Sequence, residues 1–315
     1  MDTRSTDHFD GRRFFNPSGP ALQAIAAVPR MLRAPRTPWP SRIDVTPQRP
    51  ASRGDASAVL TFIGHSTFLI QTAAGNILTD PVYAERAGQW GLAGPRRVRR
   101  PAVALDALPP IAIVLLSHNH YDHCDRHTLK MLARRFDPTA VTPLGNGALL
   151  RSSGLRCVEE LDWWDQSRTT GLPVTVTPAH HFSARGPFDR NRALWGGFMI
   201  ETAGRRIYFA GDTAYMSSFA AIRQRFAPID LALLPIGAYE PRWFMRSVHM
   251  NPEEAAQAHV DLQARQSIGM HFGTFQLTAE GIDEPLRALG EALISKGIPQ
   301  ADFRTLTFGE SFVLE

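Results

Sequence analysis

The sequence predicts a mixed α/β protein in which strands and helices alternate along one domain. Short apolar runs of strand length recur from Val59 onward, separated by helix signals and by turns rich in glycine. The run Ile111–Leu116 is almost wholly apolar, which is typical of a strand buried on both faces. A helix with strong start signals follows Asn251, because Pro252 occupies its first position and acidic residues come next. No repeat of fixed period is evident, so one α/β domain is the simplest organisation.

The individual elements are expected from periodicity and start signals. Ala21–Leu32 should form a short helix, and a second helix should begin after Asp125 as N-cap, with Leu129, Leu132 and Phe136 at helical spacing. The expected strands are Val59–Ile63, Thr67–Thr72, Asn76–Thr79, Ile111–Leu116, Val174–Thr177, Phe198–Glu201, Ile207–Ala210, Leu231–Leu234 and Ile268–Met270.

Residues 1–54 differ from the rest because they are rich in proline and show little strand-like alternation. We expect an N-terminal arm that lies over a main domain of residues 55–315. The short helix of the arm is basic-flanked, so contact with a membrane is one interpretation, and packing on the protein's own core is the favoured one. The first residues lack the basic-then-apolar layout of a secretory signal.

The composition limits which compartments and binding partners are expected for this protein. The chain has 315 residues, a net charge of +4 and only two cysteines, Cys124 and Cys157. No disulfide framework is indicated, and a reducing cytoplasmic compartment fits, with peripheral contact at the inner membrane face as an addition. The densest basic cluster, Arg96–Arg100, could bind phosphate or an anionic headgroup, although a solvated loop is the favoured interpretation.

A histidine-rich segment directly after the buried run predicts a metal centre. His118, His120 and His123 flank Asp122, and alternate residues of an extended loop point the same way. Imidazole and carboxylate are ligands that zinc prefers, although manganese or iron can occupy similar sites. Cys124 is expected to be a small buried neighbour rather than a nucleophile.

The same placement recurs downstream, because each further candidate ligand follows the end of an expected strand. His180 and His181 follow one strand, Asp212 follows another, and His271 follows a third. If parallel strands deliver them, these side chains should meet at one sheet edge. So many ligands exceed the four of a closed structural zinc site, so we expect two ions with Asp212 bridging and open positions for water and substrate.

Longer motifs resemble one branch of a known superfamily. These motifs are Ser117–His123, Phe209–Tyr215, Pro235–Met245, His249–Ala255 and His271–Phe275. They are similar to the metallo-β-lactamase superfamily, and within it to the N-acyl-phosphatidylethanolamine-hydrolysing phospholipases D. The resemblance runs from about Phe62 to the C-terminus. It implies a four-layer αββα sandwich, two Zn²⁺ ions and dimerisation. The metal ligands that it implies are His118, His120, Asp122, His123, His181, Asp212 and His271.

The resemblance also assigns supporting roles. Within the pattern Pro-x-x-His it favours His181 as the ligand, which leaves His180 beside the site. His65 and Asp80 match positions that orient ligand imidazoles, and a plain turn role for Asp80 is an open alternative. His249 would contact substrate or donate a proton, beside Asp122 and Asp212 as the other catalytic residues. By their residue types, Tyr239, Arg242, Trp243, Phe244 and Met245 suit a substrate loop with an acyl-chain wall and with Arg242 facing a phosphate, and ordinary core packing is the open alternative.

These observations predict hydrolysis of a phosphodiester, and the resemblance implies N-acylethanolamine and phosphatidic acid as products. A lactonase acting on a sugar-phosphate lactone keeps the same site, but the aromatic loop favours a lipid substrate. A nucleic-acid hydrolase ranks below both, because no aromatic-basic platform for single strands is evident and no nucleic-acid partner is expected. A metal-binding protein without catalysis is the remaining alternative.

Overall fold

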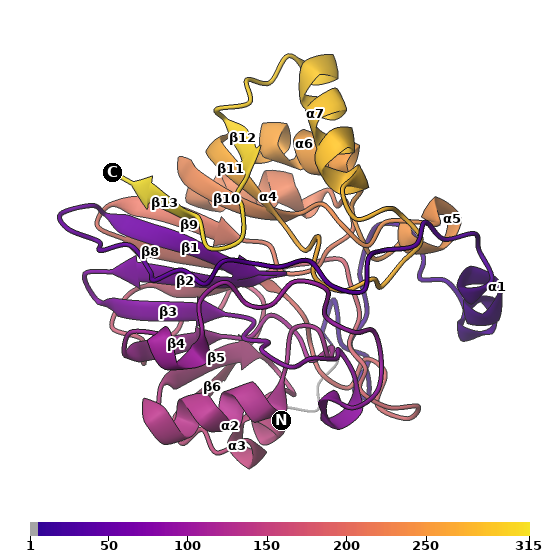
Figure 1. Ribbon diagram of the computed structural model, residues 1–315. Helices are drawn as coiled ribbons and strands as arrows, with labels where there is room; N and C mark the ends of the chain where they lie inside the picture. Colours follow the sequence, from indigo (N-terminus) through magenta and orange to yellow (C-terminus); the bar gives the residue numbers. More distant parts are fainter. Residues whose placement is uncertain (1–5) are drawn as a thin grey trace.

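Two facing sheets form the centre of the molecule in the computed structural model, which describes residues 6–315 (Figure 1). The seven-stranded sheet has the order β13-β1-β2-β3-β4-β5-β6 and the six-stranded sheet the order β12-β11-β10-β9-β8-β7. The strands of the first sheet are β1 (Ala58–Gly64), β2 (Thr67–Thr72), β3 (Gly75–Thr79), β4 (Ile111–Leu115), β5 (Thr139–Pro143), β6 (Val158–Leu161) and β13 (Ser311–Leu314). The strands of the second are β7 (Val174–Thr177), β8 (Gly197–Thr202), β9 (Arg205–Phe209), β10 (Ile229–Pro235), β11 (Ala264–Met270) and β12 (Phe303–Thr305).

Helices cover both outer faces, so the layers follow the order αββα (Figure 1). The first sheet carries α2 (Arg126–Arg135) and α3 (Gly147–Ser152), drawn at the bottom of the figure. The second carries α4 (Ser218–Phe226), α6 (Pro252–Leu262) and α7 (Glu284–Lys296), drawn at the top. Two short helices, α1 (Val28–Leu32) and α5 (Arg242–Met245), lie beside each other away from the sheets. The predicted four-layer fold is confirmed.

Alternating side chains of the first sheet fill two different cores, which explains its almost continuously apolar strands. In β2, Phe68 and Ile70 join the large core between the sheets, whereas Leu69 joins the smaller core under α2 and α3. In β4, Ile113 and Val114 divide in the same way. Because successive side chains of a strand point to opposite faces, a strand covered on both sides needs apolar residues at every position.

The helix-start predictions hold. The Asp125 side chain accepts a hydrogen bond from the His127 backbone at the start of α2. Asn251 and Glu254 form a reciprocal capping box at the start of α6, with Pro252 in the first turn. The arm helix is shorter than predicted: a 3-10 turn at Ile25–Ala27 leads into α1, and α1 has no buried residue among those described.

The ligand-bearing strands do not belong to one sheet edge, as the sequence suggested, but to two sheets. In the first sheet β1 and β3 both pair antiparallel with β2, and β4 is parallel to β3, so β1, β3 and β4 run the same way. In the second, β7 and β9 both pair antiparallel with β8, while β10 joins β9 to β11 in parallel. The loops after these strands meet at the same end of the sandwich. Among the described helices, none is long and apolar enough to cross a membrane.

Candidate metal centre

Loops after six strands bring a cluster of buried histidines and aspartates together. The residues after β1, β3 and β4 come from the first sheet, and those after β7, β9 and β11 come from the second. This arrangement places in one region every candidate ligand predicted from the sequence, together with His65 and Asp80, which were predicted to support the ligands. In the order of these strands, the residues are His65; Asp80; His118, His120, Asp122 and His123; His181; Asp212; and His271.

The first group consists of His118, His120 and His181, whose nearest ring nitrogens converge. The Nδ1 atom of His120 lies 2.9 Å from Nε2 of His118 and 3.2 Å from Nε2 of His181. The far nitrogens of the other two rings are occupied. His181 Nδ1 donates to the Val248 carbonyl at 2.8 Å, and His118 Nδ1 lies 2.9 Å from the Ser117 hydroxyl. Because a carbonyl only accepts, the Nε2 lone pair of His181 is free to bind a metal.

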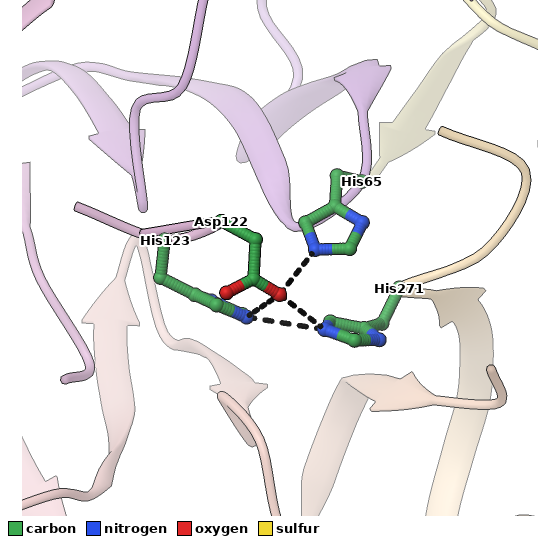
Figure 2. A group of neighbouring side chains, drawn as sticks. All are labelled: His65, Asp122, His123 and His271. Carbon is green, nitrogen blue, oxygen red and sulfur yellow. Dashed lines mark hydrogen bonds and ion pairs between the residues drawn. The ribbon is translucent and has the colours of Figure 1, made fainter. Parts of the chain in front are cut away.

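The second group consists of His65, Asp122, His123 and His271 (Figure 2). Three ring nitrogens surround one oxygen of Asp122, at 3.1 Å from His65, 3.6 Å from His123 and 3.4 Å from His271. Figure 2 shows the His65 ring pointing directly at this carboxylate. His65 therefore contacts Asp122, where the sequence had suggested that it orients an imidazole.

Asp212 lies between the two groups. Its Oδ2 atom is 3.1 Å from the Nε2 atoms of both His123 and His271. The same oxygen is 3.9 Å from Nε2 of His118 and 3.8 Å from Nε2 of His181 in the first group. One carboxylate thus faces ring nitrogens of both groups, which is the position that a bridging ligand requires.

Asp80 fixes the orientation of the second group from outside. Its carboxylate accepts a hydrogen bond from Nδ1 of His123 at 2.7 Å. It also accepts from the backbone and hydroxyl of Ser117, at 2.7 and 2.6 Å. Since this contact holds a proton on Nδ1, Nε2 of His123 is the nitrogen that faces the centre and the one that would bind a metal.

Burial and charge set the protonation of the cluster. Burial lowers the pKa of His120 to about 3 and that of His181 to about 4, so the first group is neutral. Burial opposes any increase at His271, but the carboxylates of Asp212 and Asp122 outweigh it and raise its pKa to about 9. Burial works against ionisation of Asp212 too, yet His123 and His271 hold its pKa well below the ordinary value. The anionic Asp212 carboxylate therefore faces imidazole rings that are either neutral or able to lose a proton, as ligands must do when a metal ion binds.

The donor set fits metal ions. Imidazole nitrogens and carboxylate oxygens are the ligand types of borderline divalent cations. Among the described residues, Oδ1 of Asp212 and Nδ1 of His271 and His249 are buried without a hydrogen-bond partner. Burying so many polar atoms, some without a hydrogen-bond partner, costs folding free energy unless a bound cation interacts with them. The His/Asp clusters can thus bind metal.

The N-terminal arm also holds the metal centre, through a residue that the sequence analysis missed. The Asn16 side-chain amide donates to the His181 carbonyl at 2.8 Å, and its oxygen accepts from the His181 backbone at 3.3 Å. His180 turns away from the centre, with Nε2 3.0 Å from the Pro20 carbonyl. Asn16 stands in a proline-rich segment without periodicity, so nothing in the sequence marked it.

His249 lies at the edge of the cluster, with Nε2 3.9 Å from Oδ2 of Asp212. Burial lowers its pKa well below the ordinary value, and the ring is therefore neutral. A neutral imidazole suits hydrogen bonding to a substrate better than donation of a proton to a leaving group.

The loop predicted to contact substrate divides into two parts. Phe244 and Met245 line the cavity above the cluster, on the one-turn helix α5. Arg242 was predicted to face a phosphate, but it pairs with Glu254 at 2.8 Å and donates to the His249 carbonyl. Tyr239 and Trp243 also lie outside the cavity lining. Glu280, which the sequence analysis missed, holds this loop by accepting hydrogen bonds from the backbone of residues 238–240.

The basic cluster Arg96–Arg100 is not one solvated loop. Arg97 is buried and donates to the carbonyls of Val82 and Ala84, so it supports the turn after β3. Arg99 is half-buried and donates to the Gly273 carbonyl at 2.8 Å. Cys124 is fully buried, which raises its thiol pKa to about 12 and removes it as a nucleophile.

Comparison with known proteins agrees with this geometry. The family described as the β-lactamase superfamily domain matches residues 75–272. The chain belongs to the β-lactamase superfamily. It is 38% identical over 264 residues to the N-acyl-phosphatidylethanolamine-hydrolyzing phospholipase D 1 of Caenorhabditis elegans, a match that covers 79% of this chain and 74% of the worm protein. It is 31% identical over 239 residues to a metal-dependent hydrolase of Rubrobacter xylanophilus, covering 73% of this chain and 89% of that protein.

A solved structure shares the superfamily's fold. The possible metal-dependent hydrolase of Veillonella parvula superposes with a TM-score of 0.67 at 19% identity, covering 82% of this chain and all of the other (100%). This β-lactamase-superfamily chain therefore has named hydrolases among its relatives and shares the fold of that solved structure.

Replacement of Asp80 by asparagine tests the outer support of this superfamily site. Asp80→Asn keeps the size and tolerates the positive φ of 34°, but the neutral amide is a weaker partner for His123. We expect metal affinity to fall about 10- to 100-fold, measured by competition with a chromophoric chelator. The matched control is Asp137→Asn, which also has a positive φ (48°) but pairs with Arg156 on the surface. Equal metal affinity in wild type and Asp80→Asn would contradict the role.

Replacement of Asn16 tests the contribution of the arm. Asn16→Ala removes both hydrogen bonds to the His181 backbone, and we expect weaker retention of the metal held by the first group. The measurement is metal content by mass spectrometry after dialysis against a chelator. Ser18→Ala, an exposed change in the same arm, should retain metal as wild type does. Identical retention by both variants would show that the arm does not support the centre.

Proposed function

We propose that this chain is a dinuclear metal-dependent phosphodiesterase that hydrolyses N-acyl-phosphatidylethanolamine to N-acylethanolamine and phosphatidic acid. The observation that carries the proposal is a mostly apolar cavity of about 520 Å³ that opens onto the metal cluster. His120, Asp122, Asp212 and His249 all line this cavity. The worm relative, whose name states this activity, supports the choice of substrate.

The cavity offers separate surfaces for acyl chains and for the phosphodiester. Polar groups of the cluster lie on one side, and apolar side chains come from four segments of the chain. Those apolar residues are Val28, Met31, Phe182, Phe244, Met245, Val248 and Leu277. A small polar lactone would leave this wall without a partner, so the lipid is the better fit than the sugar-phosphate lactone.

Arg190 is the arginine that faces this cavity, in place of the predicted Arg242. Its guanidinium stacks over the Phe182 ring at 4.8 Å and lines the same space. Burial lowers its pKa, but an arginine stays charged at neutral pH. It is positioned to contact a lipid phosphate oxygen.

Two zinc ions are the cofactors that we propose, held by His118, His120 and His181 on one side and by Asp122, His123 and His271 on the other, with Asp212 between them. When bound, such ions lower the pKa of water and stabilise the charge that develops on phosphoryl oxygens. Manganese or iron could fill the same donor set.

The chain's own residues would then position the reaction. A water oxygen forms a bond to phosphorus, the bond from phosphorus to the ethanolamine oxygen breaks, and that oxygen leaves with a proton. Asp122 and Asp212 accept hydrogen bonds from the attacking water, and the free Oδ1 of Asp212 is available for this. His249, as a neutral imidazole, hydrogen-bonds to a phosphoryl oxygen, while the apolar wall excludes other water.

A lipid substrate implies contact with a membrane surface, and we propose that the cavity mouth makes it. The helices α1 and α5 lie beside each other (Figure 1), and residues of both line the cavity. Between the two helices the Arg30 guanidinium stacks over Trp243 at 4.5 Å. Leu32 is 57% exposed and Trp243 39% exposed, so both offer apolar surface there. We propose that the protein lies in the cytoplasm and makes this peripheral contact at the inner face of the membrane. Dimerisation stays a prediction from the resemblance.

Removal of the central carboxylate tests the scheme. Asp212→Ala should lose bound metal and turnover together, because Asp212 faces both groups. Products from N-acyl-phosphatidylethanolamine are measured by mass spectrometry beside metal content. Asp106→Ala, an exposed aspartate elsewhere on the surface, is the control. Full turnover by Asp212→Ala would refute the mechanism, and no product from metal-loaded wild type would refute the substrate and make lactones the next choice.

A change in the apolar wall tests the acyl site. Phe244→Ser should lower kcat/KM about tenfold for a long acyl chain, since loss of aromatic contact costs more than 1.4 kcal/mol, while a short-chain phosphodiester is affected little. The ratio of kcat/KM for the two substrates is the measurement. Val260→Ser, which changes an exposed apolar residue of α6 outside the cavity, should leave that ratio unchanged. An unchanged ratio in Phe244→Ser would exclude this wall as the acyl site.

A further inference from the structure

A second cavity, of about 380 Å³, lies on the other side of the loop that carries His118–His123. Its floor comes from α2 and α3, and its wall from residues 84–91. Four cationic side chains reach it, namely Arg86, Arg126, Lys130 and Arg185, with His127 beside them. Asp125 is the one carboxylate among the described residues that line it.

These cations have no acidic partner within residues 6–315. Their described contacts go to neutral oxygens: Arg86 donates to the Gly94 carbonyl at 2.9 Å, and Arg126 to the Ser152 hydroxyl at 3.1 Å. Arg185 donates to the carbonyls of Asn119 and Cys124. By contrast, Arg205 and Arg265 elsewhere in the chain share the carboxylate of Asp230. The cavity therefore concentrates positive charge that the protein itself leaves unneutralised.

The carboxylate of Asp125 does not cancel this charge, because its oxygens already serve the protein. They accept hydrogen bonds from the backbone of Ala84 at 3.0 Å and of His127 at 3.0 Å, and from the Thr128 hydroxyl at 2.5 Å. The nearby buried Arg97 acts as its electrostatic partner. Asp125 is an N-cap with its acceptors filled, and an anion in the cavity would meet the arginines first.

A constrained loop places an aromatic ring at the mouth of this cavity. Trp90 is 79% exposed, on a loop closed by backbone hydrogen bonds from Ala87 to Pro95 and from Arg97 to Glu85. The neck of the loop admits only glycine, because a Cβ on Gly88 would lie 2.1 Å from the Ala93 carbonyl oxygen. An exposed tryptophan held in a defined loop beside several cations is typical of a binding surface.

We propose that this cavity is an anion-binding site for a phosphate group, separate from the metal centre. Arg126 and Arg185 offer the planar donors that match phosphate oxygens, and Lys130 adds a point charge. The site does not depend on the proposed lipid substrate. The same side chains would bind the phosphate free in solution or as the headgroup of an anionic lipid.

Tyr121 connects this site to the metal centre. The Arg185 guanidinium stacks over the Tyr121 ring at 4.0 Å, and the Tyr121 hydroxyl donates to the Arg185 carbonyl at 2.8 Å. Tyr121 also lines the metal-site cavity and stands between the candidate ligands His120 and Asp122. An anion bound to Arg185 would therefore touch a side chain that stacks on Tyr121, which belongs to the loop of candidate ligands.

The test follows Trp90 with inorganic phosphate as the probe. Metal-loaded protein is labelled with 5-fluorotryptophan, and the Trp90 signal among the six tryptophans is assigned with Trp90→Phe. Phosphate should shift this signal, and the double variant Arg126→Gln, Lys130→Gln should bind about tenfold more weakly or worse. Reading Trp90 separates this event from phosphate bound at the metals.

Arg134→Gln is the matched control, since Arg134 is an exposed arginine of the same helix outside the cavity lining, and it should bind as wild type does. Vesicles of phosphatidylcholine with or without phosphatidic acid distinguish the sources. A Trp90 signal that broadens with vesicles containing phosphatidic acid but not with pure phosphatidylcholine vesicles, and that sharpens again when phosphate is added, would identify a lipid headgroup. A signal that shifts with inorganic phosphate but does not respond to either kind of vesicle would identify the soluble anion. A Trp90 signal that responds to neither, or that responds equally in the double variant, would overturn the proposal.

Discussion

One buried carboxylate oxygen, Oδ2 of Asp212, governs the arrangement of the site and much of the fold around it. Ring nitrogens from both sheets lie within 3.9 Å of it, so the two sheets must end at the same place. Packed imidazoles repel one another whenever they are protonated, and burial makes each charge more costly. The anionic Asp212 and Asp122 offset this cost, which is why the carboxylates stand among the rings. The residues around Asp212 are His118, His123, His181, His249 and His271.

Strand ends supply these side chains, but sharp turns aim them. His65, Asp80 and His271 all have positive φ, at 58°, 34° and 62°, directly after β1, β3 and β11. Aspartate and histidine adopt this backbone region more readily than most residues, although at some cost in free energy. The cost is offset because the chain turns away from the strand direction at once and points the side chain between the sheets. The backbone of His271 also donates to the His65 carbonyl at 2.9 Å, which ties the ends of the two sheets together.

Much of the fold and of the cluster could be predicted, because both depend on local patterns. Apolar strand runs with His or Asp directly behind them mark the ligand positions, and the start signals at Asp125 and Asn251 mark two helices. The error about a single sheet edge arose because local patterns do not reveal which sheet a strand joins. Asn16 and Glu280 were missed since they act on distant backbone groups, through contacts that are 165 and 40–42 residues apart in the chain. Arg242 was misassigned because its ion pair with Glu254 joins two helices, and the sequence pattern does not show which helices lie in contact.

The loop from Ser117 to Asp125 has two faces, and each face has its own supporting contacts. Toward the sheets it presents the candidate metal ligands, and the hydrogen bonds between Ser117 and Asp80 hold it there. On the other face Arg185 donates to its carbonyls at Asn119 and Cys124, so a positive charge supports the loop from behind. A cation in this place opposes the binding of metal cations at the front unless an anion reduces its field. Negative charge in the cavity around Arg185 would therefore reduce this opposing field at the candidate metal centre.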